Sequence, residues 1–303
     1  MMRSNTLKQM ERKRERIRLK IYKRRKIGRS RAGNIVLYLV LIMLGVVFAF
    51  PIFFMVNNAF KPIHELMQFP PLIMVRNPTF DSFRMLAMLM NQTLVPMSRY
   101  MFNTFMFVIV GTFGQLIIGC MAAYPLAKFD FAGDKAINQL LVIALLFTTT
   151  ILVVPQFLIM NFLGIIDTYL AIILPGLGTT LGVYLMRNFM VSVPSSLIEA
   201  AYVDGAGDFY ILWRIIIPAV KPAVITMFIL SFSAFWGVSG TGVLYTETLK
   251  PFAAALSQIT TGALVRVGPS MVASLILFVI PLALFIFMQT RMVETMASSG
   301  LKE

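Results

Sequence analysis

Few residue types in this chain could support acid–base, nucleophilic or metal chemistry. The 303 residues include one histidine, His64, and one cysteine, Cys120. Zinc sites combine several His and Cys ligands, and an intrachain disulfide needs two cysteines, so we expect neither here. The sequence also lacks the phosphate-binding pattern GxxxxGK[ST] and the nucleophile pattern GxSxG. We therefore expect no metal, no cofactor and no nucleotide hydrolysis in this chain.

One polar stretch lies between two apolar runs: "SSLIEAAYVDGAGDFYILWRIIIPAV", from Ser195 to Val220. It holds three acids and two glycines within ten residues, in a chain that is 58% hydrophobic. These residues are Glu199, Asp204, Gly205, Gly207 and Asp208. So polar a segment is expected to be exposed to water, and the apolar elements on either side of it must position it.

The composition places those elements in a bilayer. Only 13% of the residues are charged and the mean hydropathy is +0.80, which is outside the range of soluble domains. A helix of roughly 18 or more uncharged residues can cross a hydrocarbon core. Six runs reach that length, and they cover residues 32–60, 100–127, 136–166, 168–186, 222–246 and 267–290. The sequence therefore predicts an all-α membrane protein with six transmembrane helices.

Two shorter uncharged runs, 85–98 and 251–265, contain Pro96 and Pro251. We expect them to be parts of external loops or re-entrant pieces, because they are too short to span. A GxxxG pair, Gly178 and Gly182, lies in the fourth span and predicts close helix packing there.

The expected domains follow the charge distribution. A basic arm covers residues 1–33, a transmembrane domain residues 34–290 and a tail residues 291–303. Within the transmembrane domain, an external loop covers about 57–101, and a cytoplasmic loop over about 191–220 contains the polar stretch between helices four and five. Both termini are then cytoplasmic.

The basic arm decides this orientation. Residues 1–33 hold 14 of the 27 Lys and Arg, with only Glu11 and Glu15 as acids. The first span is too long for the apolar region of a signal peptide, and no small-residue cleavage pattern follows it. The favoured interpretation is a cytoplasmic topology anchor that lies on anionic lipid. Nucleic-acid binding is the alternative, but no fold that could read bases accompanies the arm.

The polar stretch has the signals of two short helices separated by a turn. Ser196 and Glu199 have the spacing of a capping box, which would begin the first helix at Leu197. Gly205 or Gly207 can take the left-handed conformation that ends it.

The second short helix is expected over "FYILWRIII", with Asp208 as its cap and Pro218 as its end. The small residues Ala200 and Ala201 on the first helix would let another surface approach closely. The sequence thus predicts a helix-turn-helix beneath the membrane.

The stretch resembles the cytoplasmic signature of permease subunits of bacterial binding-protein-dependent ABC importers. That signature is E-A-A, three residues, Gly, nine residues, Ile-x-Leu-Pro. The matching residues are Glu199, Ala200, Ala201, Gly205, Ile215 and Pro218, with Ile217 where leucine is usual. "DGAG" at 204–207 resembles the carbohydrate-uptake branch, and "FKPIHEL", "AAYPLAKFDFAG", "LGIIDTYLAIILP" and "SGLK" resemble the maltose-type second permease. The resemblance covers nearly everything after residue 35.

The resemblance implies an importer subunit in a bacterial plasma or inner membrane. Its partners would be a second permease, most simply in a heterodimer, two ATPase subunits that use ATP and Mg, and an external solute-binding protein. The polar stretch would be the coupling helix that fits a groove on the ATPase. The residues that carry over to this coupling loop are Glu199, Ala200, Ala201, Asp204, Gly205, Ala206, Ile215 and Pro218.

Uncharged hydrogen-bonding and aromatic side chains in the spans suit a path for a neutral sugar. The candidates are Thr148, Thr149, Gln156, Ser231, Ser233 and Trp236. Each has an ordinary alternative, since a membrane Ser or Thr often bonds its own helix backbone and a Trp often anchors an interface. No charged residue lies inside a predicted span, which argues against ion-coupled transport.

Three functions remain open on the sequence. The favoured one is a permease for a carbohydrate, specifically an oligosaccharide. The second is a permease of the same architecture for a non-sugar solute. The third is a membrane-embedded enzyme, which would need a cluster of catalytic side chains at membrane depth that the sequence does not contain.

Overall fold

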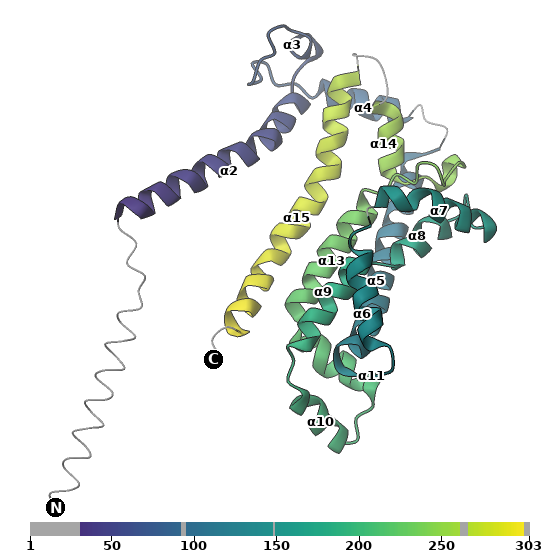
Figure 1. The fold of residues 1–303 in the computed structure, drawn as a ribbon. Coiled ribbons are helices and arrows are strands. Elements are labelled where there is room, and N and C mark those ends of the chain that lie inside the picture. Colours follow the sequence, from purple (N-terminus) through teal and green to yellow (C-terminus); the bar gives the residue numbers. More distant parts are fainter. Residues whose placement is uncertain (1–30, 92–94, 148, 261–265, 300–303) are drawn as a thin grey trace, which may run out of the picture. The chain divides into compact units, whose positions relative to one another are not determined.

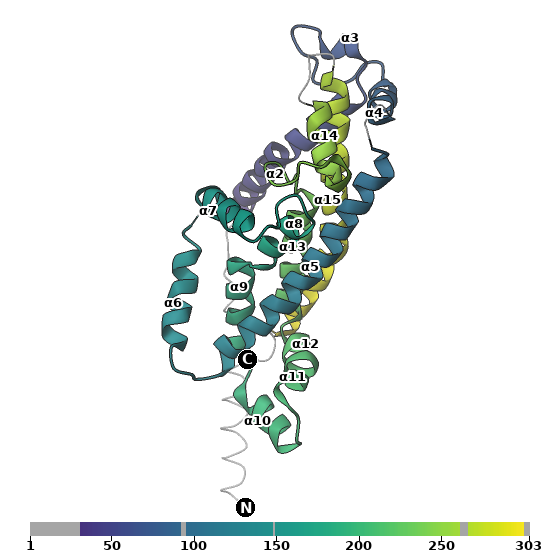
Figure 2. The same cartoon turned by 90° about the vertical axis from the view of Figure 1, so that its right-hand side faces the viewer.

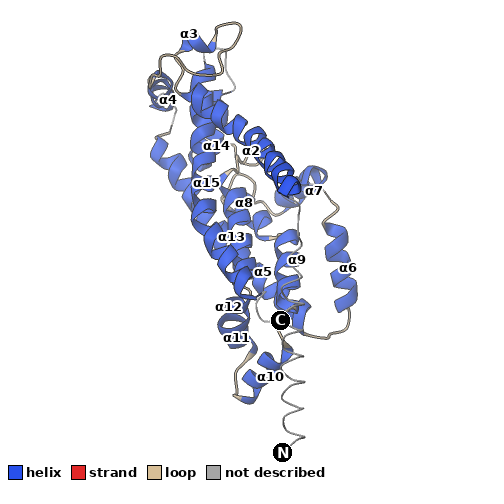
Figure 3. Cartoon of the chain, turned by 90° about the vertical axis from the view of Figure 1, so that its left-hand side faces the viewer, coloured by secondary structure: helices blue, strands red, loops and turns tan. Residues whose placement is uncertain are grey.

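The computed structural model describes residues 31–91, 95–147, 149–260 and 266–299. Within these ranges the chain forms helices, turns and loops, and no strand (Figure 3). The expected all-α class is therefore confirmed for this part of the chain. Most of the expected basic arm lies outside the described residues, and so does Thr148.

The chain divides into two compact units, Met1–Phe54 and Met55–Glu303. The described part of the first unit belongs to α2 (Arg31–Ala59), whose last residues reach into the second. Residues 33–59 of this helix are apolar enough and long enough to cross a membrane, in agreement with the first expected span.

The second unit is built around its long helix α5. Its main helices are α5 (Met97–Lys128), α8 (Leu170–Leu177), α9 (Thr180–Val191), α13 (Lys221–Trp236) and α15 (Val267–Ser299). α5 packs against α8, α9 and α13, and α13 also packs against α15 (Figure 1). Segments far apart in sequence thus share one helix bundle.

Short helices lie at the two opposite ends of this bundle. At one end are α10 (Ser195–Val203) and α11 (Asp208–Ile211), and at the other are α3 (Ile63–Leu66), α4 (Asp81–Asn91) and α14 (Phe252–Thr260) (Figures 1 and 2). Buried apolar clusters lie at both ends, with a third between α5, α8 and α13. The polar stretch is therefore anchored on a packed core.

The number of helices long enough to span a membrane is smaller than the six expected. In the described residues four qualify by length and composition, or five if the bent pair Asp208–Ala219 and Lys221–Trp236 is one span. The expected span at 222–246 ends as a helix at Trp236. The expected span at 168–186 consists of α8 and α9, which are separated by two non-helical residues.

The uncharged run at residues 136–166, expected to hold one span, is divided between two helices. This run forms α6 (Asp134–Ala144) and α7 (Thr149–Phe162), which lie in different directions (Figure 2). The chain leaves the first helix in a tightened turn, where the Phe147 N–H donates to the Ala144 carbonyl at 3.3 Å. A break between two helices needs no charged residue, so the length of an uncharged run does not predict one unbroken helix.

The two shorter uncharged runs contain helices too short to span. The run at 251–265 includes α14, and the run at 85–98 includes the end of α4 and the start of α5. Both α4 and α14 pack against α15 at the end of the bundle far from α10.

Glycines let the central helices approach closely. A Cβ at Gly182 would lie 2.8 Å from Met227 Cε, which supports the expected packing role of this residue. Its GxxxG partner Gly178 is different, because the nearest atom to a Cβ there is the Pro175 carbonyl oxygen at 3.8 Å. Two close contacts instead surround Phe235, whose ring lies 2.4 Å from a Cβ at Gly111 and 2.5 Å from one at Gly176.

We expect Gly176→Ala to destabilise the protein and Gly178→Ala to leave its stability near that of the wild type. The Phe235 ring is buried between Gly111 and Gly176, so it cannot move away from a new methyl group at position 176 without clashing elsewhere. Such overpacking costs about 1–3 kcal/mol. The measurement is the melting temperature of each purified variant in detergent, and equal melting temperatures for the two variants would contradict this packing.

Candidate functional site

The polar stretch forms a helix, α10, that ends in a left-handed glycine. Gly205 has a φ of 81°. Its N–H donates to the Tyr202 carbonyl at 3.0 Å, and the Ala206 N–H donates to the Ala201 carbonyl at 2.9 Å. These two bonds make the Schellman motif, which satisfies the last carbonyls of a helix and favours glycine at the left-handed position. The expected left-handed end of the helix is confirmed at Gly205.

The start of α10 differs from the expected capping box. The helix begins at Ser195, and Pro194 occupies the capping position with a φ of −59° and no side-chain cap hydrogen bond in the described structure. Because Pro194 fixes φ, the chain enters the helix two residues before Leu197. Ser196 therefore lies inside the helix, where its hydroxyl cannot cap it, and the side chain of Glu199 is exposed.

The second half of the stretch consists of three short helical pieces. They are α11, a π-helical turn over Leu212–Ile216 and α12 over Ile217–Ala219. Gly207, not Asp208, precedes α11 at the capping position. The Asp208 carboxylate instead accepts a hydrogen bond from the Tyr202 hydroxyl. That bond joins α10 to α11 and raises the pKa of Tyr202 above its ordinary value.

Pro218 does not end the second helix, contrary to expectation. It lies inside α12, and the chain turns only after Val220, where the pair Asp208–Ala219 and Lys221–Trp236 is bent by 88°. Since Pro218 lacks an N–H, it cannot bond the carbonyl of Arg214 in an α-helical ladder. Arg214, whose carbonyl lacks that bond, lies within the π-helical turn.

The segment from α10 to α12 has one buried and one exposed face. Buried side chains pack with α5 and α9 in an apolar cluster, and they include Ile198, Ala201, Ile211 and Ile216. Large apolar side chains on the outer face are exposed, and they include Leu197, Val203, Phe209 and Tyr210. Exposed apolar groups beside acids are typical of a protein-binding surface. A hollow of about 580 Å³ opens here, with Gly205, Tyr210 and Arg214 among its lining.

Polar contacts join α5 to α9 and to the turn before α10 at this end of the bundle. The Lys128 ammonium at the end of α5 donates to the carbonyls of Val191 and Val193, on either side of the end of α9. The Arg187 guanidinium on α9 donates to the Leu126 carbonyl at 3.3 Å. Movement of the turn before α10 would therefore be transmitted to α5 and α9.

The structure brings the eight expected coupling residues to this one end of the bundle. Ala201 is buried, Ala206 and Ile215 are half-buried, and Glu199, Ala200, Asp204, Gly205 and Pro218 are exposed.

At the opposite end, Asp167 holds the connection that follows α13. Its carboxylate accepts the backbone N–H groups of Tyr245 and Thr246, both at 2.8 Å, and the Thr246 hydroxyl. The hydroxyl of Thr246 is the largest cause of the lowered pKa of Asp167. Asp167 itself has a φ of 59°, a conformation that aspartate tolerates better than most residues.

A buried amide holds the same connection from α5. Asn103 is fully buried, and its Nδ2 donates to the carbonyls of Thr248 at 2.8 Å and Lys250 at 2.9 Å. Its Oδ1 accepts the hydroxyl of Tyr169 at 2.9 Å. The loop between α13 and α14 is thus fixed by polar contacts from two other elements.

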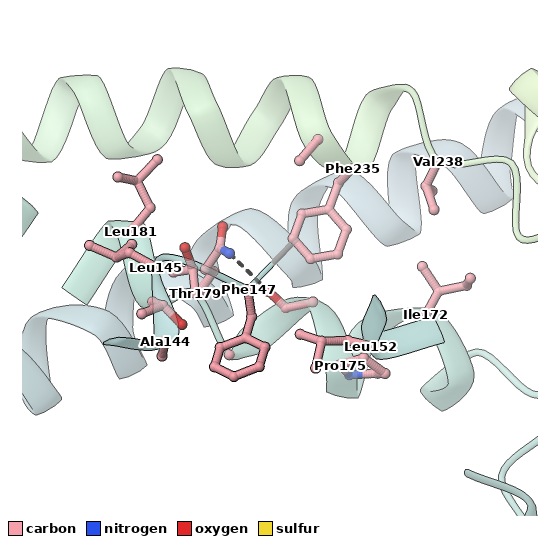
Figure 4. Close-up of a pocket in the computed structure, with 15 residues that line it drawn as sticks. Ala144, Leu145, Phe147, Leu152, Ile172, Pro175, Thr179, Leu181, Phe235 and Val238 are labelled. Atoms are coloured by element: carbon pink, nitrogen blue, oxygen red, sulfur yellow. Dashed lines mark hydrogen bonds between the residues drawn. The ribbon is translucent and has the colours of Figure 1, made fainter. Parts of the chain in front are cut away.

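Two partly open cavities lie beside α8 in the second unit. The first, of about 700 Å³, is lined by α5, α8, α9, α13 and the turn after α6 (Figure 4). The second, of about 550 Å³, is lined by α7, α8 and the turn after α13. They share Ile172, Pro175, Gly176 and Val238 in their walls.

The residues expected along a solute path have different surroundings. Gln156 lines the second cavity. Ser231 and Trp236 are buried, and the Trp236 indole N–H donates to the Leu277 carbonyl at 3.1 Å in the packing of α13 on α15. Ser233 is exposed, and Thr149 begins α7. Thr148 lies outside the described residues.

Several polar residues in the cavity walls were absent from that set. Gln115, Thr179 and Thr180 line the first cavity, and Ser239 and Thr241 line the second. Gln115 is an amide near the middle of an uncharged span, a sequence signal that could have identified it.

Comparisons with known proteins agree over most of the chain. Residues 115–296 match the family described as binding-protein-dependent transport system inner membrane component. The chain is 30% identical to the arabinooligosaccharides transport system permease protein AraQ of Bacillus subtilis (strain 168), over 67% of this chain and 72% of that protein. It is 26% identical to the polygalacturonan/rhamnogalacturonan transport system permease protein YtcP of the same organism, over 76% and 79% of the two chains.

A solved structure has a similar fold. It belongs to a bacterial ABC transporter involved in the import of the acidic polysaccharide alginate, and the similarity has a TM-score of 0.71. The match covers 87% of this chain and 98% of the other at 21% identity, so it bears on the fold alone.

Proposed function

Because the chain belongs to the family of binding-protein-dependent transport system inner membrane components, we propose that it is the permease subunit of an ATP-driven importer for carbohydrate. The solute proposed is an oligosaccharide, as the name of the relative AraQ indicates for that protein. A polar sugar cannot cross apolar lipid unaided. The helices must therefore form a path that opens alternately to the two sides, driven by an energy source outside this chain.

The observation that carries the proposal is the segment from α10 to α12. It exposes apolar side chains outward and packs inward on α5 and α9. Lys128 and Arg187 join those two helices to each other and to the turn before α10. A partner that binds this surface could move α5 and α9 together. That is the geometry a coupling element needs.

The proposed assembly contains a second permease, in a heterodimer, and two ATPase subunits that bind ATP and Mg. The ATPases would dock on the segment from α10 to α12, and an external binding protein would deliver the solute at the other end of the bundle. The fixed loop between α13 and α14 lies at that other end. It offers a preformed surface to such a partner.

The proposed topology is a multi-pass protein of the bacterial plasma membrane with six spans and both termini in the cytoplasm. Within the second unit, the C-terminal part of α15 points toward the same end as α10, which supports one shared side (Figures 1 and 2). The basic residues of the arm support a cytoplasmic N-terminus. Reporters inserted at residues 10, 131, 205 and 300 should then be cytoplasmic, and one near residue 80 external.

The function is tested with the complete importer, purified from its host with its ATPase and binding protein. ATP hydrolysis should rise when the binding protein carries an oligosaccharide, and cells that lack this chain should lose uptake of that sugar. Stimulation by an amino acid or a metal-loaded binding protein, with no response to sugars, would reject carbohydrate uptake. An external reporter signal at residue 205 would reject the docking of an ATPase there.

A further inference from the structure

The first cavity contains an unusual amide. Gln115 on α5 is 8% exposed, and its Nε2 donates to the Gly176 carbonyl at 2.9 Å. Its Oε1 is buried and has no hydrogen-bond partner among the described residues. A buried acceptor without a partner costs about 1–3 kcal/mol, so a group that donates to it would be bound favourably.

The break between α8 and α9 faces the same cavity. α8 ends at Leu177, and Gly178 and Thr179 are extended before α9 begins. The Thr179 hydroxyl accepts the Gly182 N–H at 3.1 Å and caps α9, while Thr180 and Leu181 in its first turn line the cavity. N–H groups in the first turn of a helix lack intrahelical acceptors, and this end of a helix carries partial positive charge.

The two features together specify the chemistry of a ligand. The Gln115 oxygen needs a donor, whereas the first turn of α9 needs an acceptor. A hydroxyl group can donate to one and accept from the other. A carboxylate can only accept, and it would meet the Gln115 oxygen with repulsion.

The remaining walls suit a sugar ring. They are largely apolar, and Figure 4 shows the rings of Phe147 and Phe235 near Thr179 and Pro175. A volume of about 700 Å³ is within the range of small-molecule sites. Apolar walls with a few polar groups would hold the faces of a sugar and orient its hydroxyls.

We propose that this cavity is a solute subsite for a neutral sugar, in which a hydroxyl donates to Gln115 Oε1 and accepts from the first turn of α9. The inference rests on the proposed function, because the sugar is cargo that passes through the membrane. Beyond that function, the proposal gives the position of the sugar in the cavity, two residues that bind it and its lack of charge. Gln115 and Thr180 are its specificity-determining residues.

The first test measures uptake by cells that express the complete importer with Gln115→Leu or Thr180→Val. The matched controls are Asn138→Leu, which also removes an amide with an unpartnered oxygen in the described structure, and Thr226→Val, whose hydroxyl bonds the Pro222 carbonyl. Neither control residue lines the first cavity. The probes are labelled neutral arabino- and malto-oligosaccharides and, separately, oligogalacturonate.

Gln115→Leu should lower the maximal uptake of the neutral probe about tenfold and Thr180→Val about threefold, since a hydrogen bond contributes about 0.5–1.5 kcal/mol. The controls should stay within about twofold of the wild type on the same scale. Membrane abundance and ATPase co-purification, measured alongside, should be unchanged. Normal uptake by both cavity variants would overturn the subsite.

A second measurement does not depend on Gln115→Leu folding. Because Cys120 is the chain's one cysteine, a Cys120→Ala, Thr180→Cys chain in the purified importer has a single thiol, at the cavity. Neutral oligosaccharide should slow its modification by N-ethylmaleimide about threefold or more, in line with occupancy of a weak site. Oligogalacturonate should not.

Protection by oligogalacturonate alone, or no protection by either class, would overturn the neutral subsite. Failure of the proposed function can be distinguished from failure of the subsite. A wild-type importer that takes up no carbohydrate rejects the proposed function as well. A wild-type importer that takes up neutral sugar while both cavity variants behave normally rejects the subsite only.

Discussion

Gly205→Val is expected to abolish uptake while the protein still reaches the membrane. The φ of 81° at this position favours glycine, and a residue with a Cβ costs roughly 1–2 kcal/mol there, more if it is β-branched. No described heavy atom lies within 4 Å of the Cβ position, so the cost arises from the backbone and not from a clash. The chain would relieve it by opening the Schellman motif, which would displace α10 from α11.

Gly207→Val is the matched control. Gly207 also has an open Cβ position, but its φ of −82° and ψ of 163° are accessible to any residue. Membrane abundance, ATPase co-purification and uptake should be measured for both variants. We expect Gly205→Val to lower ATPase association or uptake at least about tenfold, and Gly207→Val to stay close to the wild type.

Each outcome has a separate meaning. If Gly207→Val fails as badly as Gly205→Val, added bulk blocks the partner and the left-handed backbone is not the cause. If Gly205→Val assembles and transports like the wild type, the stretch is a mere connector and the coupling assignment is wrong.

The sequence predicted the turn of the segment from α10 to α12 better than its ends. Gly205 was identifiable because few residues other than glycine adopt the left-handed conformation readily. The predicted capping box was wrong because α10 begins at Ser195, directly after Pro194, and not at Leu197. Where the helix begins depends on the path of the chain after α9. Since Glu199 does not cap α10, loss of function in Glu199→Ala would report a contact with the partner.

Span prediction had a similar limit. Uncharged length correctly located α2, α5 and α15, each of which is one long helix, and also the span Leu170–Val191 that α8 and α9 form together. It could not locate the breaks near residues 145–148 and 178–179, because neither break requires a charge. The cavity beside α8 was also beyond the sequence. Gln115 and Thr180 are 65 residues apart, and only the packing of α5 on α8 and α9 brings them to one wall.

Asn103→Leu is expected to cause the largest loss of stability outside the packed glycines. The substitution removes three hydrogen bonds and leaves the partly buried Lys250 carbonyl without its donor, whereas the Thr248 carbonyl keeps a hydrogen bond from Arg99. Each bond contributes about 0.5–1.5 kcal/mol, and a stranded buried group costs more, so we expect a loss of about 2–4 kcal/mol. The melting temperature of the purified chain and hydrogen exchange at residues 245–251 measure it.

Tyr169→Phe provides the graded comparison, because it removes the hydroxyl that donates to Asn103 but leaves both carbonyl contacts intact. It should cost about 1 kcal/mol. The double variant should lose less than the sum of the two single losses, since both remove the same bond. If Asn103→Leu instead melts with the wild type and exchange at residues 245–251 is unchanged, the loop between α13 and α14 must be held by its other contacts, those of Asp167, Arg99 and Tyr100.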